Sequence, residues 1–270
     1  MKLLKKLLKK LVWIFLPKSV RKLYYETMVF WSQRKLAVVL PEGCEYPVFL
    51  RRGETDFNLY HEIFVHDLCY EITLPFRPKF MIDCGGNIGL AAIYFKLQYP
   101  EIKIVTIEPE TSNFELLERN IAPYQSDIIA LNMGVWNKTT KLIVKNFIGT
   151  AWAFVTEEVT SDNVTNIENS VDAIGINDIL SKYANESGGI IDLLKVDIEG
   201  SENQLFRTNY EWLSKTRAIV IEFHNRFRPD CSEVFHKAVS KYHFKEISFH
   251  GNRNRGGVGF YINEDIVETK

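Results

Sequence analysis

A carboxylate followed by a glycine-rich turn is the first feature of this sequence that could do chemistry. Residues 80–89 read FMIDCGGNIG, an apolar run that ends in Asp83 and continues through Gly85, Gly86 and Gly89. Glycines let a backbone approach a ligand closely and adopt positive φ angles. A second carboxylate, Glu108, ends the next apolar run, 102–107. At that place a carboxylate can accept hydrogen bonds from both hydroxyls of a ribose.

The position of Asp83 separates two kinds of nucleotide ligand. A dinucleotide site presents helix N-terminal amides to a pyrophosphate and prefers the spacing GxGxxG. Asp83 stands just before the glycines, where it would repel a pyrophosphate but suits a cationic amino group. The pattern therefore favours S-adenosylmethionine, an adenosyl ligand with a charged amino-acid end. An NAD(P)-dependent oxidoreductase is the alternative function, because Glu108 would bind the ribose of either cofactor. The structural alternative for Asp83 is that it caps the N-terminus of the following helix.

Four further polar side chains lie around the ends of two later apolar runs. Asp197 and Glu199 follow the run 190–196, and Glu222 and His224 lie around the end of the run 218–223. Adjacent parallel strands are ~4.8 Å apart, so we expect these groups to converge on one edge of the ligand pocket. The structural alternatives are that Glu199 caps the following helix and that Glu222 pairs with Arg226.

These four residues, taken as catalytic, fit two mechanisms. In the first, His224 is the general base, since an unperturbed pKa of ~6.5 lets imidazole accept a proton near neutral pH. In the second, Asp197 with Glu199 or Glu222 holds a divalent cation such as Mg²⁺, which lowers the pKa of an acceptor hydroxyl. We favour the metal-free mechanism, because the spacing along the sequence shows no tight ligand cluster.

The elements that must position these residues alternate from residue 80 onward. Strands are expected at 80–83, 102–107, 128–132, 190–196 and 218–223, with a closing hairpin at 244–249 and 258–262. Helices are expected at 88–98, 112–121, 176–183, 202–206 and 233–241, and short rim strands at 142–154 and 171–173. Such alternation predicts an α/β fold, in which helices cover both faces of a parallel sheet and ligands bind at the carboxyl ends of its strands.

The first residues have a different character. Residues 1–16 read MKLLKKLLKKLVWIFL, in which leucines recur at three- and four-residue steps and lysines occupy the other face of a helix. The longest uninterrupted apolar run, residues 11–16, is far shorter than the ~20 residues that span a bilayer. This pattern is typical of a basic amphipathic helix in the interface of an anionic membrane. We expect a cytoplasmic protein, peripheral on the inner face of a membrane; docking of the helix on protein is the alternative.

Charge is distributed unevenly along the 270 residues. The net charge is −1, but residues 1–22 hold eight basic side chains and no acidic one, which leaves 25 basic against 34 acidic side chains in the rest. An acidic body argues against nucleic acid as a partner. We divide the chain into a basic amphipathic helix (1–22), a helical cap segment (23–79) and a catalytic domain (80–265). Oligomeric state leaves no signal in the sequence.

Several stretches in order resemble the FkbM family of S-adenosylmethionine-dependent methyltransferases. The matching stretches are IDCGGNIGL at 82–90, IEPETSNFELLERN at 107–120, IDLLKVDIEGSENQLF at 191–206, RRGETDFNLYHEIF at 51–64 and VIEFHNRFRPDC at 220–231. The resemblance implies a class I methyltransferase (Rossmann-like) fold, a seven-stranded, mostly parallel sheet with an antiparallel last strand. It also implies O-methylation, often of glycan sugars or of polyketide and related metabolites.

Carried over by residue, the resemblance implies a cofactor site for S-adenosylmethionine at Asp83, Gly85, Gly86, Asn87, Gly89, Glu108, Pro109, Asn113, Met133 and Gly134. Trp136 is expected in the core, and Thr55 and Asp56 either cap the pocket or begin a helix. We expect an O-methyltransferase whose acceptor is a small molecule or glycan, a hydroxyl of a sugar or of a cell-surface glycan intermediate. The non-enzymatic alternative is a catalytically inactive, membrane-associated scaffold.

Overall fold

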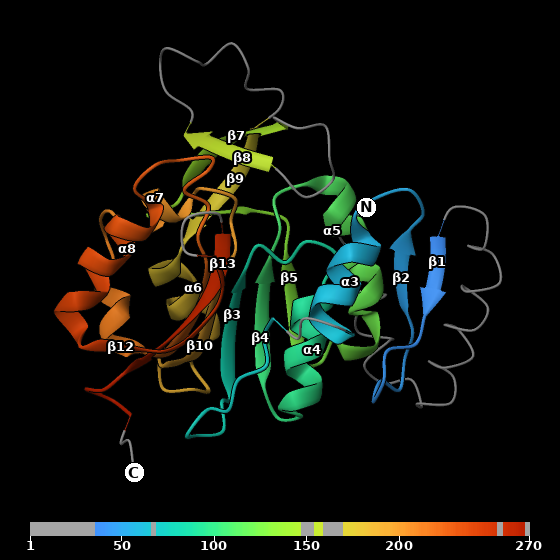
Figure 1. Cartoon of the computed structure of the whole chain (residues 1–270), viewed down its shortest axis with the longest axis horizontal. Coiled ribbons are helices and arrows are strands. Elements are labelled where there is room, and N and C mark those ends of the chain that lie inside the picture. Colours follow the sequence, from blue (N-terminus) through green and yellow to red (C-terminus); the bar gives the residue numbers. More distant parts are fainter. Residues whose placement is uncertain (1–35, 66–68, 147–153, 159–169, 253–255, 268–270) are drawn as a thin grey trace.

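The computed structural model describes residues 36–65, 69–146, 154–158, 170–252 and 256–267. Its centre is a seven-stranded sheet in the order β12-β13-β11-β10-β3-β4-β5 (Figure 1). These strands are β3 (Phe80–Cys84), β4 (Lys103–Ile107), β5 (Ile128–Leu131), β10 (Ile191–Val196), β11 (Thr216–Glu222), β12 (Phe244–Asn252) and β13 (Gly256–Asn263). The five strands from β5 to β11 are parallel, and β13, the last strand in the chain, pairs antiparallel with both β11 and β12. The predicted class I topology is confirmed.

Alternating apolar side chains make the central sheet bury both faces. In β3, Met81 belongs to one core, and Phe80 and Ile82 belong to the other, because successive side chains of a strand point to opposite faces. Helices α3 (Asp56–Phe64), α4 (Leu90–Gln98) and α5 (Thr111–Asn120) cover the first face. Helices α6 (Ile176–Tyr183), α7 (Glu202–Leu205) and α8 (Cys231–Val239) cover the second. Short 3-10 helices follow α5, precede β11 and follow α8 (Ala122–Tyr124, Glu211–Lys215 and Ser240–Tyr242).

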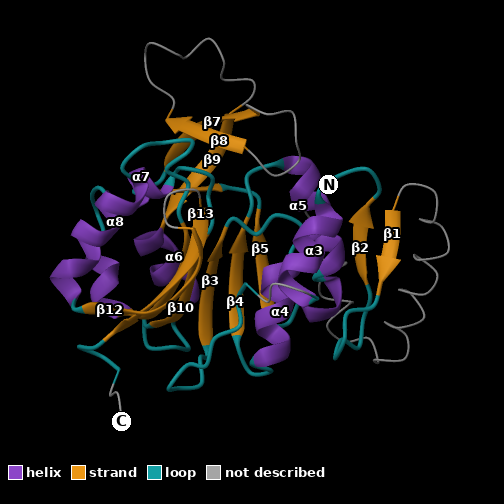
Figure 2. Cartoon of the chain, viewed as in Figure 1, coloured by secondary structure: helices purple, strands orange, loops and turns teal. Residues whose placement is uncertain are grey.

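A smaller sheet lies beyond the carboxyl ends of the parallel strands, at the top of Figure 2. Its order is β6-β9-β7-β8, with β6 (Gly134–Trp136), β7 (Thr140–Asn146), β8 (Phe154–Glu158) and β9 (Ser170–Gly175). The sequence predicted strands here as a rim of the main sheet. They pair instead with one another, around a small core of Trp136, Leu142 and Ala173. This core is the reason that Trp136 is buried, as expected.

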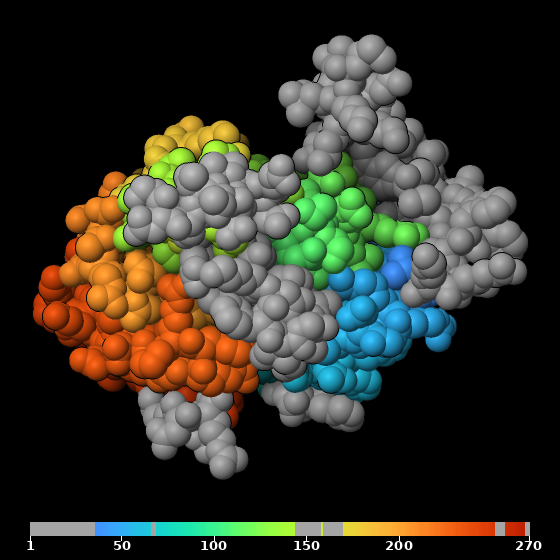
Figure 3. Space-filling model, turned by 90° about the horizontal axis from the view of Figure 1, so that it is seen from above, coloured from blue at the N-terminus to red at the C-terminus, as the bar shows by residue number. Residues whose placement is uncertain are grey.

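The cap segment before residue 80 is described at 36–65 and 69–79. Its described part contains one helix, α3, and an antiparallel pair of strands, β1 (Leu36–Val39) and β2 (Val48–Arg51). Val48, Phe49 and Leu50 are buried in the core of the first face, so β2 is held by packing that local sequence does not reveal. Viewed from above, the blue N-terminal part lies opposite the orange and red C-terminal part (Figure 3). The predicted helix at 1–22 lies outside the described residues.

Candidate active site

The glycine-rich turn after β3 is pressed against the end of β10. Gly85 has a φ of 85°, and a Cβ atom added to it would lie 1.8 Å from the carbonyl oxygen of Asp197. The turn is anchored from the other side, where the amides of Gly85 and Gly86 donate to the carbonyl of Ile107 at 3.0 and 2.8 Å. Glycine is therefore required at position 85 both for its conformation and for its lack of a side chain.

Asp83 lies beneath this turn and is outside the lining of the two pockets described below. It was expected to meet a cofactor amino group, but its side chain is 0% exposed. One carboxylate oxygen accepts from the Thr106 hydroxyl at 2.8 Å, and the other lies 3.1 Å from Lys195 Nζ. Lys195 also donates to the carbonyl of Gly85 at 2.7 Å. Asp83 thus holds the turn indirectly, through a buried lysine that sequence reasoning missed, although a lysine inside the apolar run IDLLKV was a visible signal.

Lys195 lies between two carboxylates, those of Asp83 and Asp197. Its Nζ also lies 3.5 Å from Asp197 Oδ2. Burial lowers the pKa of Lys195, but the Asp83 and Asp197 carboxylates outweigh that effect and raise the pKa above its ordinary value. The lysine is therefore charged at neutral pH, and it joins the end of β3 to the end of β10.

A pocket opens between the glycine-rich turn, the end of β4 and the start of the smaller sheet. Of the expected cofactor residues, six line it: Gly85, Asn87, Glu108, Pro109, Asn113 and Gly134. Ile107, Val135, Ile198 and Ser201 line it as well and were not predicted. Four expected residues lie outside the lining. They are Asp83, Gly86 (against Thr106 and Leu117), Gly89 (the N-cap of α4) and the half-buried Met133, which packs on the core.

Glu108 is held rigidly at the floor of this pocket. Its carboxylate accepts from the amides of Asn87 at 2.8 Å and Glu110 at 3.0 Å, and from Asn113 Nδ2 at 3.5 Å. The residue is only 6% exposed. Burial raises the pKa of Glu108 to about 7, although these hydrogen bonds lower it. The carboxylate keeps acceptor capacity for a diol, as a ribose requires.

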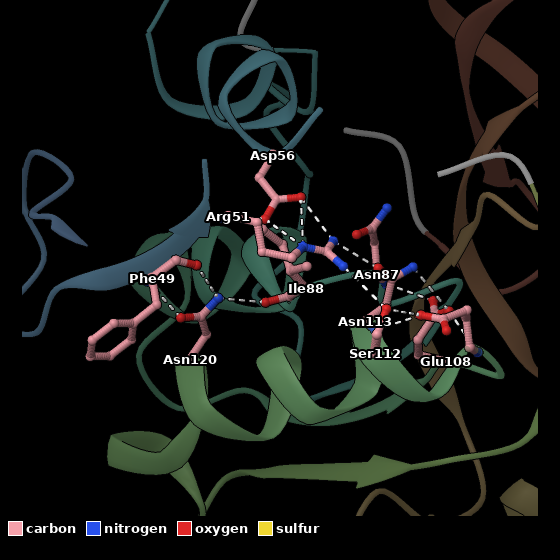
Figure 4. Close-up of polar contacts among 10 residues, drawn as sticks. Phe49, Arg51, Asp56, Asn87, Ile88, Glu108, Ser112, Asn113 and Asn120 are labelled. Carbon is pink, nitrogen blue, oxygen red and sulfur yellow. Dashed lines mark hydrogen bonds and ion pairs between the residues drawn. The ribbon is translucent and has the colours of Figure 1, made fainter. Parts of the chain in front are cut away.

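A polar chain from β2 orients Glu108 and ties the N-terminal segment to the site (Figure 4). Arg51 binds the buried carboxylate of Asp56 through Nη2 at 2.8 Å and Nε at 3.0 Å. The same Nη2 donates to Asn113 Oδ1 at 2.8 Å, which turns the Asn113 amide nitrogen toward Glu108. Asp56 therefore positions the arginine, and Thr55 stands at the N-cap of α3 without a side-chain cap hydrogen bond.

A second tie in Figure 4 fixes β2 to the end of the glycine-rich turn. Asn120, buried at the end of α5, accepts from the amide of Phe49 at 2.7 Å. Its amide nitrogen donates to the carbonyls of Phe49 at 3.2 Å and Ile88 at 2.8 Å. One side chain thus satisfies three backbone groups from two distant segments, which explains why the cap segment and the cofactor pocket form one unit.

The structure brings the four predicted catalytic residues together. His224 Nε2 lies 3.7 Å from Asp197 Oδ1, 3.4 Å from Glu199 Oε2 and 3.6 Å from Glu222 Oε1. Glu199 adopts a φ of 50°, in the left-handed turn that precedes α7. A fifth residue, Glu202, was missed: its fully buried carboxylate lies 2.9 Å from His224 Nδ1. We call Asp197, Glu199, Glu202, Glu222 and His224 the acidic cluster.

Charges in the acidic cluster bear on the expected role of His224. Burial lowers the pKa of His224, but Glu202 and the other carboxylates outweigh it and raise the pKa to about 10. Burial, with repulsion from neighbouring carboxylates, raises the pKa of Glu199 to about 8 and that of Glu222 to about 7. Among these protein charges alone the ring is an imidazolium near neutral pH, and an imidazolium has no lone pair with which to accept a proton. A general base must have that lone pair, so the role of His224 as the base needs a neutral ring and stays a prediction.

Four members of the acidic cluster, Asp197, Glu199, Glu222 and His224, line a second cavity of about 280 Å³ between α3 and the ends of β10 and β11. Thr55 and Asp56 lie on its wall, together with Asn58, Glu62 and Arg226. Asn87, Asp197 and Glu199 belong to both this cavity and the pocket of Glu108. Two neighbouring pockets that share a wall can present one bound molecule to another, as a group-transfer reaction requires.

A family model described as "Methyltransferase FkbM domain" matches residues 83–247, which is more than half of the chain. The chain belongs to the FkbM methyltransferase family. The resemblance expected from the sequence is thereby confirmed, and the protein is an S-adenosylmethionine-dependent methyltransferase. The alternatives of an NAD(P)-dependent oxidoreductase and an inactive scaffold are set aside.

Two curated relatives of this FkbM methyltransferase are fungal proteins named as methyltransferases. Methyltransferase sdnD of Sordaria araneosa is 32% identical over 192 residues, which cover 61% of this chain and 73% of that protein. Methyltransferase 1 of Beauveria bassiana is 28% identical over 172 residues, covering 57% of this chain and 67% of that protein. The crystal structure of methyltransferase FkbM from Methylobacillus flagellatus is similar with a TM-score of 0.49 and 19% identity. That match covers 74% of this chain but only 46% of the Methylobacillus flagellatus chain, so the present chain spans about half the length of that protein.

Binding of S-adenosylhomocysteine should strengthen about tenfold between pH 6 and pH 8. With a pKa of about 7, Glu108 changes from about one tenth to about nine tenths ionised over this interval, and the ionised form accepts both ribose hydroxyls. Isothermal titration measures the affinity. The Glu108→Gln variant should bind weakly with a flat pH profile; a slope that persists in this variant would assign the titration to another group.

Stability of the ligand-free protein should respond to Glu108 in the opposite direction. The pKa in the folded state is raised from 4.5 to about 7, so the contribution of Glu108 to stability is fully present below pH 4.5. It is lost as the pH rises through about 7. Thermal unfolding without ligand should therefore show this loss in the wild-type protein and not in Glu108→Gln.

Proposed function

We propose that this methyltransferase methylates a hydroxyl oxygen, on a sugar or a cell-surface glycan intermediate. The observation that carries the proposal is the cavity beside the cofactor pocket, in which the carboxylates of Asp197, Glu199 and Glu222 surround the imidazole of His224. Carboxylates accept hydrogen bonds from hydroxyl groups and repel phosphate and carboxylate groups, so a neutral polyol is the class of acceptor that suits this wall. The cavity can enclose one sugar-sized group.

Alignment and proton removal are the two tasks that the residues would perform. When bound, S-adenosylmethionine supplies a sulfonium methyl group, and its transfer to an acceptor oxygen yields S-adenosylhomocysteine, a methyl ether and a proton. Glu108 and Asn87 would fix the nucleoside end, while Asp197 and Glu199 face both ligands. The proton would pass from the acceptor hydroxyl to the acidic cluster. Such positioned proton transfer contributes about 10²–10⁴-fold in rate.

Methyl transfer from labelled S-adenosylmethionine tests this function. The full chain should label neutral sugars and lipid-linked or polymeric glycans, and S-adenosylhomocysteine should inhibit the transfer. Matched panels of amines, thiols and carboxylic acids serve as controls. Labelling confined to any of those panels would contradict the O-methyltransferase assignment, whereas labelling of a non-sugar alcohol would keep the reaction and remove the glycan.

We propose further that residues 1–16 hold the enzyme at an anionic membrane surface, near lipid-linked acceptors. The sequence pattern supports this, because on a helix the five lysines would occupy one face and the leucines the opposite face. Among the described residues, no helix has the length and apolarity to cross a bilayer. Each lysine near an anionic surface contributes about 1 kcal/mol, less at high salt.

Removal of residues 1–22 should abolish cosedimentation with vesicles that contain anionic lipid. Activity on a soluble acceptor should survive, because the pockets are built from residues 51 onward. Neutral vesicles, and anionic vesicles at high salt, are the controls for electrostatic binding. Equal sedimentation of the full and shortened chains would contradict the proposal.

A further inference from the structure

Three side chains of the acidic cluster place their ligand atoms at the separations that a metal site requires. In the described part of the chain, ligand atoms of Asp197, Glu199 and His224 all lie within 4.8 Å of one another. Metal–ligand bonds of about 2.1 Å place adjacent ligand atoms about 3 Å apart and opposite ones about 4.2 Å apart. The observed separations of 3.4 and 3.7 Å from His224 Nε2 to the two carboxylate oxygens lie between these values.

The imidazole of His224 is built as a ligand. Glu202 Oε1 lies 2.9 Å from Nδ1, and the Phe227 ring stacks on the imidazole with centroids 5.9 Å apart, so its orientation is fixed. When the ring is neutral, as a metal-bound imidazole must be, a carboxylate that accepts from Nδ1–H leaves the lone pair on Nε2. Metal-ligating histidines are usually held in this way. The side chain is 2% exposed, and its Nε2 faces three carboxylate oxygens, none within the 2.7–3.2 Å of an N–H···O hydrogen bond.

A second, independent observation comes from Glu199. Its Oε2 is buried and has no hydrogen-bond partner among the described residues, yet it points at His224 Nε2 from 3.4 Å. Without a metal, this oxygen faces only the charge of the protonated His224, at a distance beyond a hydrogen bond. A bound cation would give the buried oxygen the direct contact that it lacks. The nearest described cation to Asp197, Lys195, is already shared with the buried Asp83.

We infer that Asp197, Glu199 and His224 bind one divalent cation, with Glu202 positioning the histidine. Two carboxylates and one imidazole form a mixed oxygen and nitrogen ligand set, which suits a transition-metal cation such as Mn²⁺ better than Mg²⁺, whose preferred ligands are oxygen atoms. Three protein ligands leave further coordination positions open. Glu222 is near them, since its Oε1 lies 3.6 Å from His224 Nε2. The ion lies where the cofactor pocket and the acceptor cavity share Asp197 and Glu199.

The role of this ion in transfer rests on the proposed function, although its binding does not. An acceptor hydroxyl that enters an open position is polarised and loses its proton more readily. A neighbouring hydroxyl of the same sugar can occupy a second position and fix the acceptor. The ion would also offset the carboxylate charge that the cluster concentrates in one small volume.

Mn²⁺ itself is the probe that tests the site. The six-line electron paramagnetic resonance signal of free Mn²⁺ should disappear as one ion binds per full chain, with a Kd below about 100 µM. Asp197→Asn and His224→Ala should each weaken binding at least ~10-fold, as should the positioning variant Glu202→Gln. Glu115→Gln, an exposed carboxylate on α5, is the matched control and should bind as the wild type does.

Failure of the site and failure of the proposed function are distinguishable. No saturable Mn²⁺ binding by the wild-type chain, or unchanged binding in both Asp197→Asn and His224→Ala, overturns the metal site. The wild-type titration needs no variant, so a variant that does not fold cannot block the test. Mn²⁺ binding together with methyl transfer confined to amines, thiols or carboxylic acids would keep the site and refute the O-methyltransferase. Chelator-resistant O-methylation with no Mn²⁺ binding would do the reverse.

Discussion

Replacement of Asp197 by asparagine should lower turnover at least ~100-fold and leave the affinity for S-adenosylhomocysteine nearly unchanged. The side chain faces His224 with one oxygen and Lys195 with the other, at the wall that both pockets share. Asparagine keeps the shape but removes the negative charge needed to take up a proton or hold a cation. The ribose end of the cofactor is held elsewhere, at Glu108, so binding should survive.

Asp172→Asn provides the matched control for this result. Asp172 makes an exposed ion pair with Lys141 on the smaller sheet, with 65% of its side chain accessible, and such pairs contribute little. Steady-state kinetics and isothermal titration of both variants separate turnover from affinity. If Asp197→Asn turned over at the rate of Asp172→Asn, the acidic cluster would have no part in the chemistry.

Replacement of Gly85 by alanine should remove cofactor binding and destabilise the fold. The new Cβ would meet the carbonyl oxygen of Asp197 at 1.8 Å, a backbone atom that cannot turn aside. The turn would have to move away from β10, which displaces Asn87 and the Gly85 carbonyl that Lys195 holds. We expect a cost of about 1–3 kcal/mol from this overlap, in addition to about 1–2 kcal/mol for the left-handed backbone.

Gly53→Ala isolates the overlap from the backbone strain. Gly53 has a φ of 84°, nearly that of Gly85, but a Cβ added there would have no neighbour within 4 Å. Its variant should lose only the backbone contribution and bind S-adenosylhomocysteine normally. Chemical denaturation gives the free energy of unfolding, and titration gives the affinity. Equal losses in both variants would mean that the approach of Gly85 to Asp197 is unimportant.

Local pattern was sufficient for the order and approximate bounds of the strands of the main sheet and of the helices between them. Apolar runs such as 191–196 form buried strands because any pairing of such a run buries its side chains, whichever neighbours it acquires. The glycine turn and the acid at the end of the second strand were visible for the same reason. Their requirements, a positive φ and a strand end, are set within a few residues.

The pairing of the smaller sheet and the N-terminal hairpin could not be predicted this way, although short strands were expected at 142–154 and 171–173. β7 pairs with β9 across some 30 residues, and β2 is held by Asn120, 71 residues away. Short strands of this kind are stabilised by partners rather than by their own propensity, and partners at such separations leave no periodic signal.

Sequence alone also determined which residues reach the carboxyl edge of the sheet, but not what each of them meets there. Asp83 turned out to face Lys195 and Thr106, because side chains of adjacent strands within a closed core can pair only with one another. Glu199 follows β10 and His224 follows β11, and the two residues meet only because these strands are neighbours in the sheet. Separation along the chain hides a ligand cluster of this kind. The order of strands in the sheet is what converts scattered carboxylates into one site, and only the tertiary structure sets that order.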